Sequence, residues 1–134
     1  LKAMNGRLTR ISCVFVLTLL VTGCVGAPPS SQPFADHSLY LENNANKSAT
    51  FEITVVSQAT SETVHDRSYV LDAGEEREVY NTNSSSPDGI ETFEVQWTTR
   101  NETGQIAMTT NACYGSAYVV IEEDGSAGSL YSIC

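Results

Sequence analysis

The chain has 134 residues, a formal net charge of −9 and four cysteines, and its 16 acidic side chains outnumber 7 basic ones. A chain of this length holds one domain, and so acidic a surface excludes binding to nucleic acid. Three basic residues, Lys2, Arg7 and Arg10, precede Cys24, whereas all the carboxylates follow it. The part from Cys24 onward therefore has four basic and 16 acidic side chains, a net charge of −12.

The first 23 residues have the pattern of an export signal. Basic residues come first, and residues 11–23 then form an apolar run of 13 residues, too short to span a bilayer. The run ends in Val21-Thr22-Gly23-Cys24, which resembles the lipobox of prokaryotic lipoproteins. The resemblance implies cleavage after residue 23, lipid on Cys24, and a protein held by that lipid on the extracytoplasmic face of the cell membrane. A plain secretory signal with a chance cysteine is the alternative.

Residues 24–35 predict a flexible tether, because its prolines favour an extended chain and its small polar residues bury nothing. From residue 36 to residue 134 the pattern changes to short alternating runs separated by turn residues, and no stretch has helical periodicity. The sequence therefore predicts an all-β domain, an antiparallel two-sheet sandwich of seven or eight strands. The expected strands cover residues 37–42, 50–56, 63–71, 77–80, 90–98, 105–109, 117–122 and 129–133, with a polar loop at 81–89.

Several scattered positions of this domain form a pattern similar to that of small haloarchaeal surface proteins. They are Tyr69-x-Leu71-x-x-Gly74-Glu75, Phe93-x-Val95, Cys113-Tyr114-Gly115, Val119-x-Ile121, Asp124-Gly125 and Cys134. The resemblance implies an immunoglobulin-like sandwich, a lipobox anchor and no assigned activity. A single lysine after Cys24, Lys47, against 16 carboxylates also favours a halophilic archaeon, because concentrated salt screens the repulsion. The signal lacks a twin-arginine pair, and an ordinary acidic bacterial lipoprotein is the alternative.

The cysteine count predicts a disulfide between Cys113 and Cys134. Cys13 lies in the removed signal and Cys24 is consumed by lipid, which leaves these two in an oxidising compartment. Two free thiols, or pairing between molecules, are the alternatives.

The expected final hairpin does not align these two cysteines directly. Pairing Glu122 with Ser129 sets Cys134 opposite Ala117, which leaves Cys113 four residues away. Residues 114–116 must therefore bend back, and we expect Gly115 to supply the conformational freedom for this.

No catalytic residue, metal or cofactor is expected. The two histidines, His37 and His65, stand in no nucleophile motif, and His65 and its neighbour Asp66 face opposite sides of a strand. Copper is excluded because no histidine follows Cys113, and Met108 is an ordinary strand residue. The acidic run at residues 122–124 lacks the spacing of a calcium loop, so a solvated face is the better interpretation.

Three N-x-[ST] sequons, at Asn46, Asn83 and Asn101, lie in expected loops and are candidates for N-glycosylation. The sequence as a whole indicates a non-enzymatic surface domain that binds an envelope protein or polysaccharide, or supports the envelope structurally. An inhibitor or regulator of a secreted enzyme, presenting residues 81–89, is the alternative, and an enzyme comes third. Trp97 is expected in the core, the other interpretation being an exposed aromatic platform for sugars.

Overall fold

The structure is a computed structural model that describes residues 26–134. The signal segment and the lipobox at Cys24 lie outside the described residues. Within residues 26–134, no helix has the length and apolar character needed to cross a membrane. The elements are two short 3-10 helices, η1 (Pro29–Ser31) and η2 (Thr82–Ser85), and eight strands. The strands are β1 (Ser38–Asn43), β2 (Ala49–Ser57), β3 (Glu62–Leu71), β4 (Glu76–Asn81), β5 (Thr92–Thr98), β6 (Thr103–Thr109), β7 (Tyr114–Ile121) and β8 (Ala127–Ile133).

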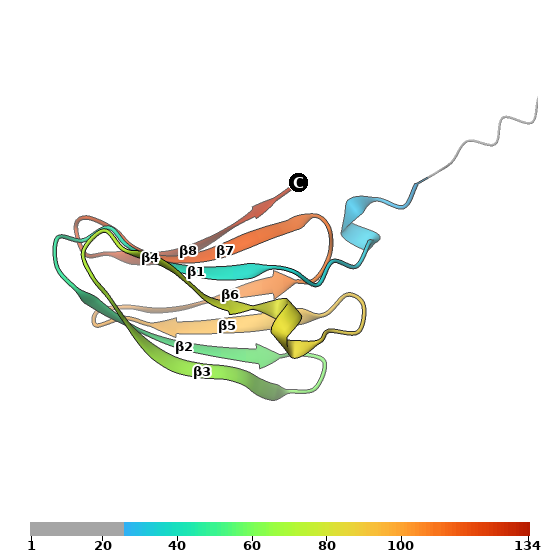
Figure 1. Cartoon of the computed structure of the whole chain (residues 1–134), viewed down its shortest axis with the longest axis horizontal. Helices are drawn as coiled ribbons and strands as arrows, with labels where there is room; N and C mark the ends of the chain where they lie inside the picture. The colour runs from blue at the N-terminus through green and yellow to red at the C-terminus, as the bar shows by residue number, and fades with distance from the viewer. Residues whose placement is uncertain (1–25) are drawn as a thin grey trace, which may run out of the picture.

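The strands form two four-stranded sheets, in the orders β4-β1-β7-β8 and β3-β2-β5-β6, and Figure 1 shows the two sheets packed face to face. The predicted all-β, two-sheet sandwich is confirmed. Each of the eight expected strands is present, and the immunoglobulin-like expectation holds at the level of two packed, mainly antiparallel sheets. One pair departs from the antiparallel rule, since β1 runs parallel to β7.

The core lies between the sheets and follows the alternation of the sequence. Buried and more exposed positions alternate along β1, β2 and β5, whereas β7 ends in three consecutive buried residues, Val119, Val120 and Ile121. The largest fully buried side chains include Phe51 and Phe93, one from each of two neighbouring strands. Alternation of period two leaves one face of each sheet apolar, and packing those faces together removes them from water.

Strand directions determine which loops meet. β1 carries the chain away from the tether, and β7 runs parallel to it with Asn43 opposite Ile121. Residues 44–48 and residues 122–126 therefore lie at the same end of the sandwich. β5 pairs antiparallel with β2 and ends where β2 begins, which brings residues 99–102 to this end as well. We call it the distal end, because the tether joins the domain at the opposite end (Figure 1).

The tether meets the domain slightly earlier than the sequence indicates. Pro33 forms an isolated bridge with Asn111, and the Phe34 amide donates to the Thr110 carbonyl at 3.0 Å. These contacts fix the residues that directly precede β1 to the end of the sandwich away from residues 44–48.

The disulfide bond between Cys113 and Cys134 is present, with the two Cα atoms 4.9 Å apart, and the Cys134 amide also donates to the Cys113 carbonyl at 2.9 Å. The expected register of the last hairpin was wrong. Ile121 pairs with Ala127, so the turn is shorter than expected and the cysteines come almost opposite each other. Only one irregularity, between Tyr114 and Ala117, remains in the ladder.

Gly115 has a different role from the expected one. Its backbone is not in the left-handed region, and a Cβ atom at this position would overlap the Ser132 hydroxyl on β8. The glycine therefore provides space for the close approach of β8, and the tight turn of the hairpin is made by Gly125, with φ of +86°.

Candidate functional site: a cleft at the distal end

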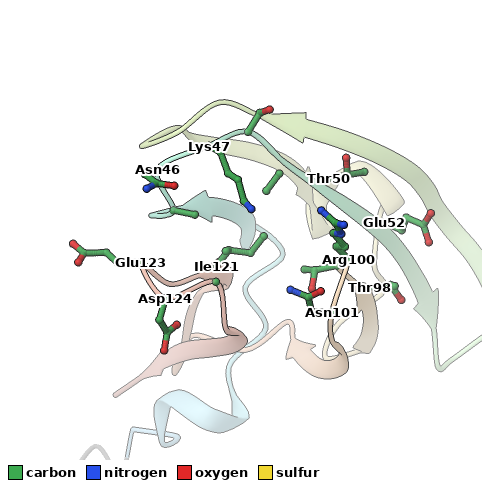
Figure 2. A pocket seen from close by; sticks show the side chains of 15 residues that line it. Asn46, Lys47, Thr50, Glu52, Thr98, Arg100, Asn101, Ile121, Glu123 and Asp124 are labelled. Carbon is green, nitrogen blue, oxygen red and sulfur yellow. The ribbon is translucent and has the colours of Figure 1, made fainter.

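The distal end contains a cleft of about 840 Å³, a size typical of ligand sites. Figure 2 shows it between the β1–β2 loop, the β5–β6 turn and the β7–β8 turn. Its apolar part comes from Ala45, Ala49 and Ile121, and its polar part includes the side chains of Lys47 and Arg100. Three segments that are far apart in the sequence thus contribute to one site.

Asn43 fixes the β1–β2 loop. Its side chain is fully buried, and its amide nitrogen donates to the carbonyls of Lys47 at 2.9 Å, Asp72 at 3.0 Å and Leu71 at 3.2 Å. Its side-chain oxygen accepts from the Ala45 amide at 3.2 Å. Since buried polar groups are costly to leave unpaired, this network holds the Lys47 backbone in one place.

The β5–β6 turn is fixed in a similar way. The Thr99 amide donates to the Glu102 carbonyl at 2.8 Å, and the Glu102 amide donates to the Thr99 hydroxyl at 3.3 Å. The Glu102 carboxylate in turn accepts from the Ala127 amide at the start of β8. Arg100 therefore projects from a short turn that is connected to both sheets.

The β7–β8 turn closes the third side of the cleft. The Glu122 amide donates to the Ser126 carbonyl at 2.8 Å, and the Asp124 carboxylate accepts from the Ser126 hydroxyl at 2.6 Å and from the Ser126 amide at 2.9 Å. These hydrogen bonds, the hydroxyl's first, hold the pKa of Asp124 below its usual range. Asp124 is therefore ionised at neutral pH and bound within its own turn.

Cations and carboxylates are oriented differently around the cleft. Three acidic residues also line the cleft: Glu52, Glu123 and Asp124. In Figure 2 the ends of Lys47 and Arg100 extend toward its interior, whereas these carboxylates point outward from its rim. Within residues 26–134 the salt bridge is between Arg77 and Glu75, and neither Lys47 nor Arg100 forms one with a described residue. Lys47 and Arg100, two of the four basic residues within residues 26–134, thus face one cleft and form no salt bridge with a described residue.

This site was not predicted from the sequence, in which Lys47 indicated only adaptation to salt and Arg100 had no assigned role. The sequence does contain one indication of the site, because Lys47 and Arg100 both stand in turns and are two of the four basic residues after Cys24. That these two turns lie at the same end of the domain depends on strand directions that the sequence does not reveal.

The three sequons are exposed and fall at both ends of the domain. Asn46 and Asn101 line the cleft, whereas Asn83 lies in η2 at the tether end (Figure 1). Glycans on Asn46 and Asn101 would therefore occupy the same space as a cleft ligand.

The structure places the two histidines in separate aromatic clusters. His65 Nε2 is 2.8 Å from the Tyr69 hydroxyl, and burial, with the nearby positive charge of Arg67, holds the pKa of His65 below its usual range. His37 is buried, and its ring meets Phe34 and Tyr114 edge-on. Within the described part of the chain, no three His, Cys, Asp or Glu side chains gather as metal ligands.

Trp97 and Met108 both belong to the core, with 6% and 0% of their surfaces exposed. Trp97 therefore offers no platform for sugars, and its indole packs against Gly104 on the neighbouring strand.

The loop at residues 81–89 is more ordered than expected. Its first part is η2, in which Thr82 is fully buried and Ser85 lies 2.7 Å from the Tyr80 hydroxyl. The loop also lies at the tether end (Figure 1). The first part of the loop is thus a 3-10 turn and not an extended segment.

Comparison with known proteins adds no relative: no family model, no curated protein and no solved structure matches this chain.

Proposed function

We propose that this protein is a cell-surface binding module, anchored by lipid on Cys24 to the extracytoplasmic face of the membrane, that binds its ligand in the distal cleft. The observation that carries the proposal is the placement of the cleft and the tether at opposite ends of the sandwich (Figure 1). A domain anchored through residues 24–35 would then present the cleft to the surroundings and not to the membrane.

The rigidity of the cleft supports the proposal. Each of its three walls is held by hydrogen bonds from the backbone or from buried side chains. A site formed in advance loses less conformational entropy when a ligand binds.

The anchor is tested by replacing Cys24 with serine and separating membranes from the medium. The variant should remain unprocessed or be released, whereas the parent stays with the membrane. Processing and membrane retention equal to those of the parent would show that Cys24 does not carry the anchor.

The cleft is tested with cell envelopes prepared from the native source, using the purified protein labelled with a fluorophore. Thr50 is exposed and lines the cleft, so Thr50→Trp should fill it and abolish binding. Gln96 is exposed on β5 outside the cleft, and Gln96→Trp should bind as the parent does. Equal binding by both variants would refute the proposal, and so would glycans on both Asn46 and Asn101 of the native protein.

A further inference from the structure

We propose that Lys47 and Arg100 form an oxyanion site within the distal cleft, and that the ligand is a sugar chain that carries carboxylate or sulfate groups. This inference rests on the proposed function, because it names the ligand class of the same cleft. It concerns two side chains, one from the β1–β2 loop and one from the β5–β6 turn.

The first argument is the scarcity of positive charge. Residues 26–134 contain 16 carboxylates and four basic side chains, so an unselective arrangement would leave basic residues paired with acids. Arg77 follows this expectation, since its guanidinium Nε donates to Glu75 at 3.0 Å, whereas Arg67, exposed on β3, forms no salt bridge with a described residue. What distinguishes Lys47 and Arg100 is therefore that they share one cleft, and the carboxylates that line it point outward from its rim (Figure 2).

The second argument is that the backbones bearing these charges are fixed while their ends are free. The Lys47 carbonyl accepts from the buried Asn43 amide at 2.9 Å, and Arg100 sits in the turn that the Thr99–Glu102 hydrogen bonds close. An oxyanion bound between the two cations would form charge-assisted hydrogen bonds with both.

The third argument concerns the carrier of the oxyanion. The cleft is also lined by Asn46, Asn101, Ser48 and Thr98, and the side chains of these four make no hydrogen bond with any described residue. Amides and hydroxyls of this kind match the alternating donors and acceptors of sugar hydroxyl groups. Apolar ligands would leave them unpaired, which is unfavourable.

Nucleic acid does not fit the site. The exported part has a net charge of −12 from four basic and 16 acidic side chains, and binding to a phosphate backbone needs many cations along a path. Two cations in one cleft suit single anionic groups. At high ionic strength the long-range repulsion between the acidic domain and an acidic glycan is screened, while contacts inside the cleft persist.

The test measures the affinity of purified, unglycosylated protein for defined probes. Polygalacturonate supplies carboxylates and dextran sulfate supplies sulfates, and unmodified dextran is the neutral polymer. Free glucuronate and glucose separate recognition of one residue from recognition of a chain. We expect binding to polygalacturonate, to dextran sulfate, or to both, and none to dextran.

Lys47→Gln and Arg100→Gln should each weaken that binding about tenfold, the size expected for one charge-assisted contact, and the double variant should abolish it. Lys47→Arg and Arg100→Lys keep the charge and should stay within about threefold of the parent. Arg67→Gln is the matched control, because Arg67 is exposed on β3, outside the cleft. A similar loss with Arg67→Gln, or full binding by the double variant, would show that attraction is not local to the cleft.

The outcomes separate this inference from the proposed function. Envelope binding that Thr50→Trp abolishes, together with no affinity for either anionic probe, overturns the oxyanion site and leaves the cleft as a binding site. Probe binding that depends on Lys47 and Arg100, with envelope binding that is indifferent to Thr50→Trp, supports the oxyanion site and overturns the proposed function. Failure of both measurements overturns both.

Discussion

Replacing Asn43 with alanine should lower the free energy of unfolding by about 3 kcal/mol and weaken ligand binding in the cleft. The variant removes a fully buried amide that donates to three carbonyls, those of Lys47, Leu71 and Asp72. The amide has two hydrogens, which the three carbonyls share, and its oxygen also accepts from the Ala45 amide, so about three hydrogen bonds are lost at about 1 kcal/mol each. For a domain of this size, 3 kcal/mol corresponds to a decrease of about 15 °C in the unfolding midpoint.

The assay is urea-induced unfolding at fixed salt with the disulfide intact, which measures the free energy of unfolding. Asn44→Ala is the matched control, because Asn44 is exposed and its side chain makes no hydrogen bond with a described residue. The control should change the free energy by less than about 0.5 kcal/mol. A decrease below about 1 kcal/mol for Asn43→Ala would refute the view that this side chain holds the β1–β2 loop in place.

Four other predictions follow from particular contacts. Gly104→Ala should destabilise the domain by about 2 kcal/mol because its Cβ would overlap the Trp97 indole, whereas Gly128→Ala, which meets nothing within 4 Å, should be neutral by the same unfolding assay. Replacing both Cys113 and Cys134 with serine should lower the free energy of unfolding by about 3 kcal/mol, and addition of reductant to the parent should reproduce that loss. The lowered pKa of His65 means that its stabilising effect is present above pH 6.5 and is lost as the pH falls toward the lowered value. The parent should therefore lose more stability than His65→Gln between pH 7.5 and 5.5, and parallel pH curves would contradict this. The thermal midpoint should also rise with added sodium chloride.

The strands could be predicted because burial follows a period of two. Alternating apolar residues locate β2 and β5 to within two residues, and turn residues separate them from their neighbours. Errors arose where small residues continue a strand. The expected strands began at residues 117 and 129, but β7 begins at Tyr114 and β8 at Ala127. Gly115 and Gly128 therefore lie within strands, where short side chains allow close packing or simply extend the ladder.

The cleft could not be predicted in the same way. It depends on the parallel pairing of β1 with β7, and alternation carries no information about which strands are neighbours. Asn43 stands before Asn44 and looks like part of a turn, yet it is the last residue of β1 and fully buried. Its hydrogen bonds and its burial depend on the ends of β3 and β7, which lie next to it in the fold and not in the sequence.

The expected effect of salt follows from where the carboxylates lie. Glu42 and Glu76 stand directly opposite each other on β1 and β4, and like charges opposite each other in a sheet are destabilising. The Debye length falls from about 30 Å at 0.01 M to about 3 Å at 1 M ionic strength, so sodium chloride screens this repulsion. Glu42→Gln combined with Glu76→Gln should raise the thermal midpoint at low salt and make it less dependent on salt. An unchanged dependence in that double variant would show that salt acts through general hydration of the surface and not through this pair.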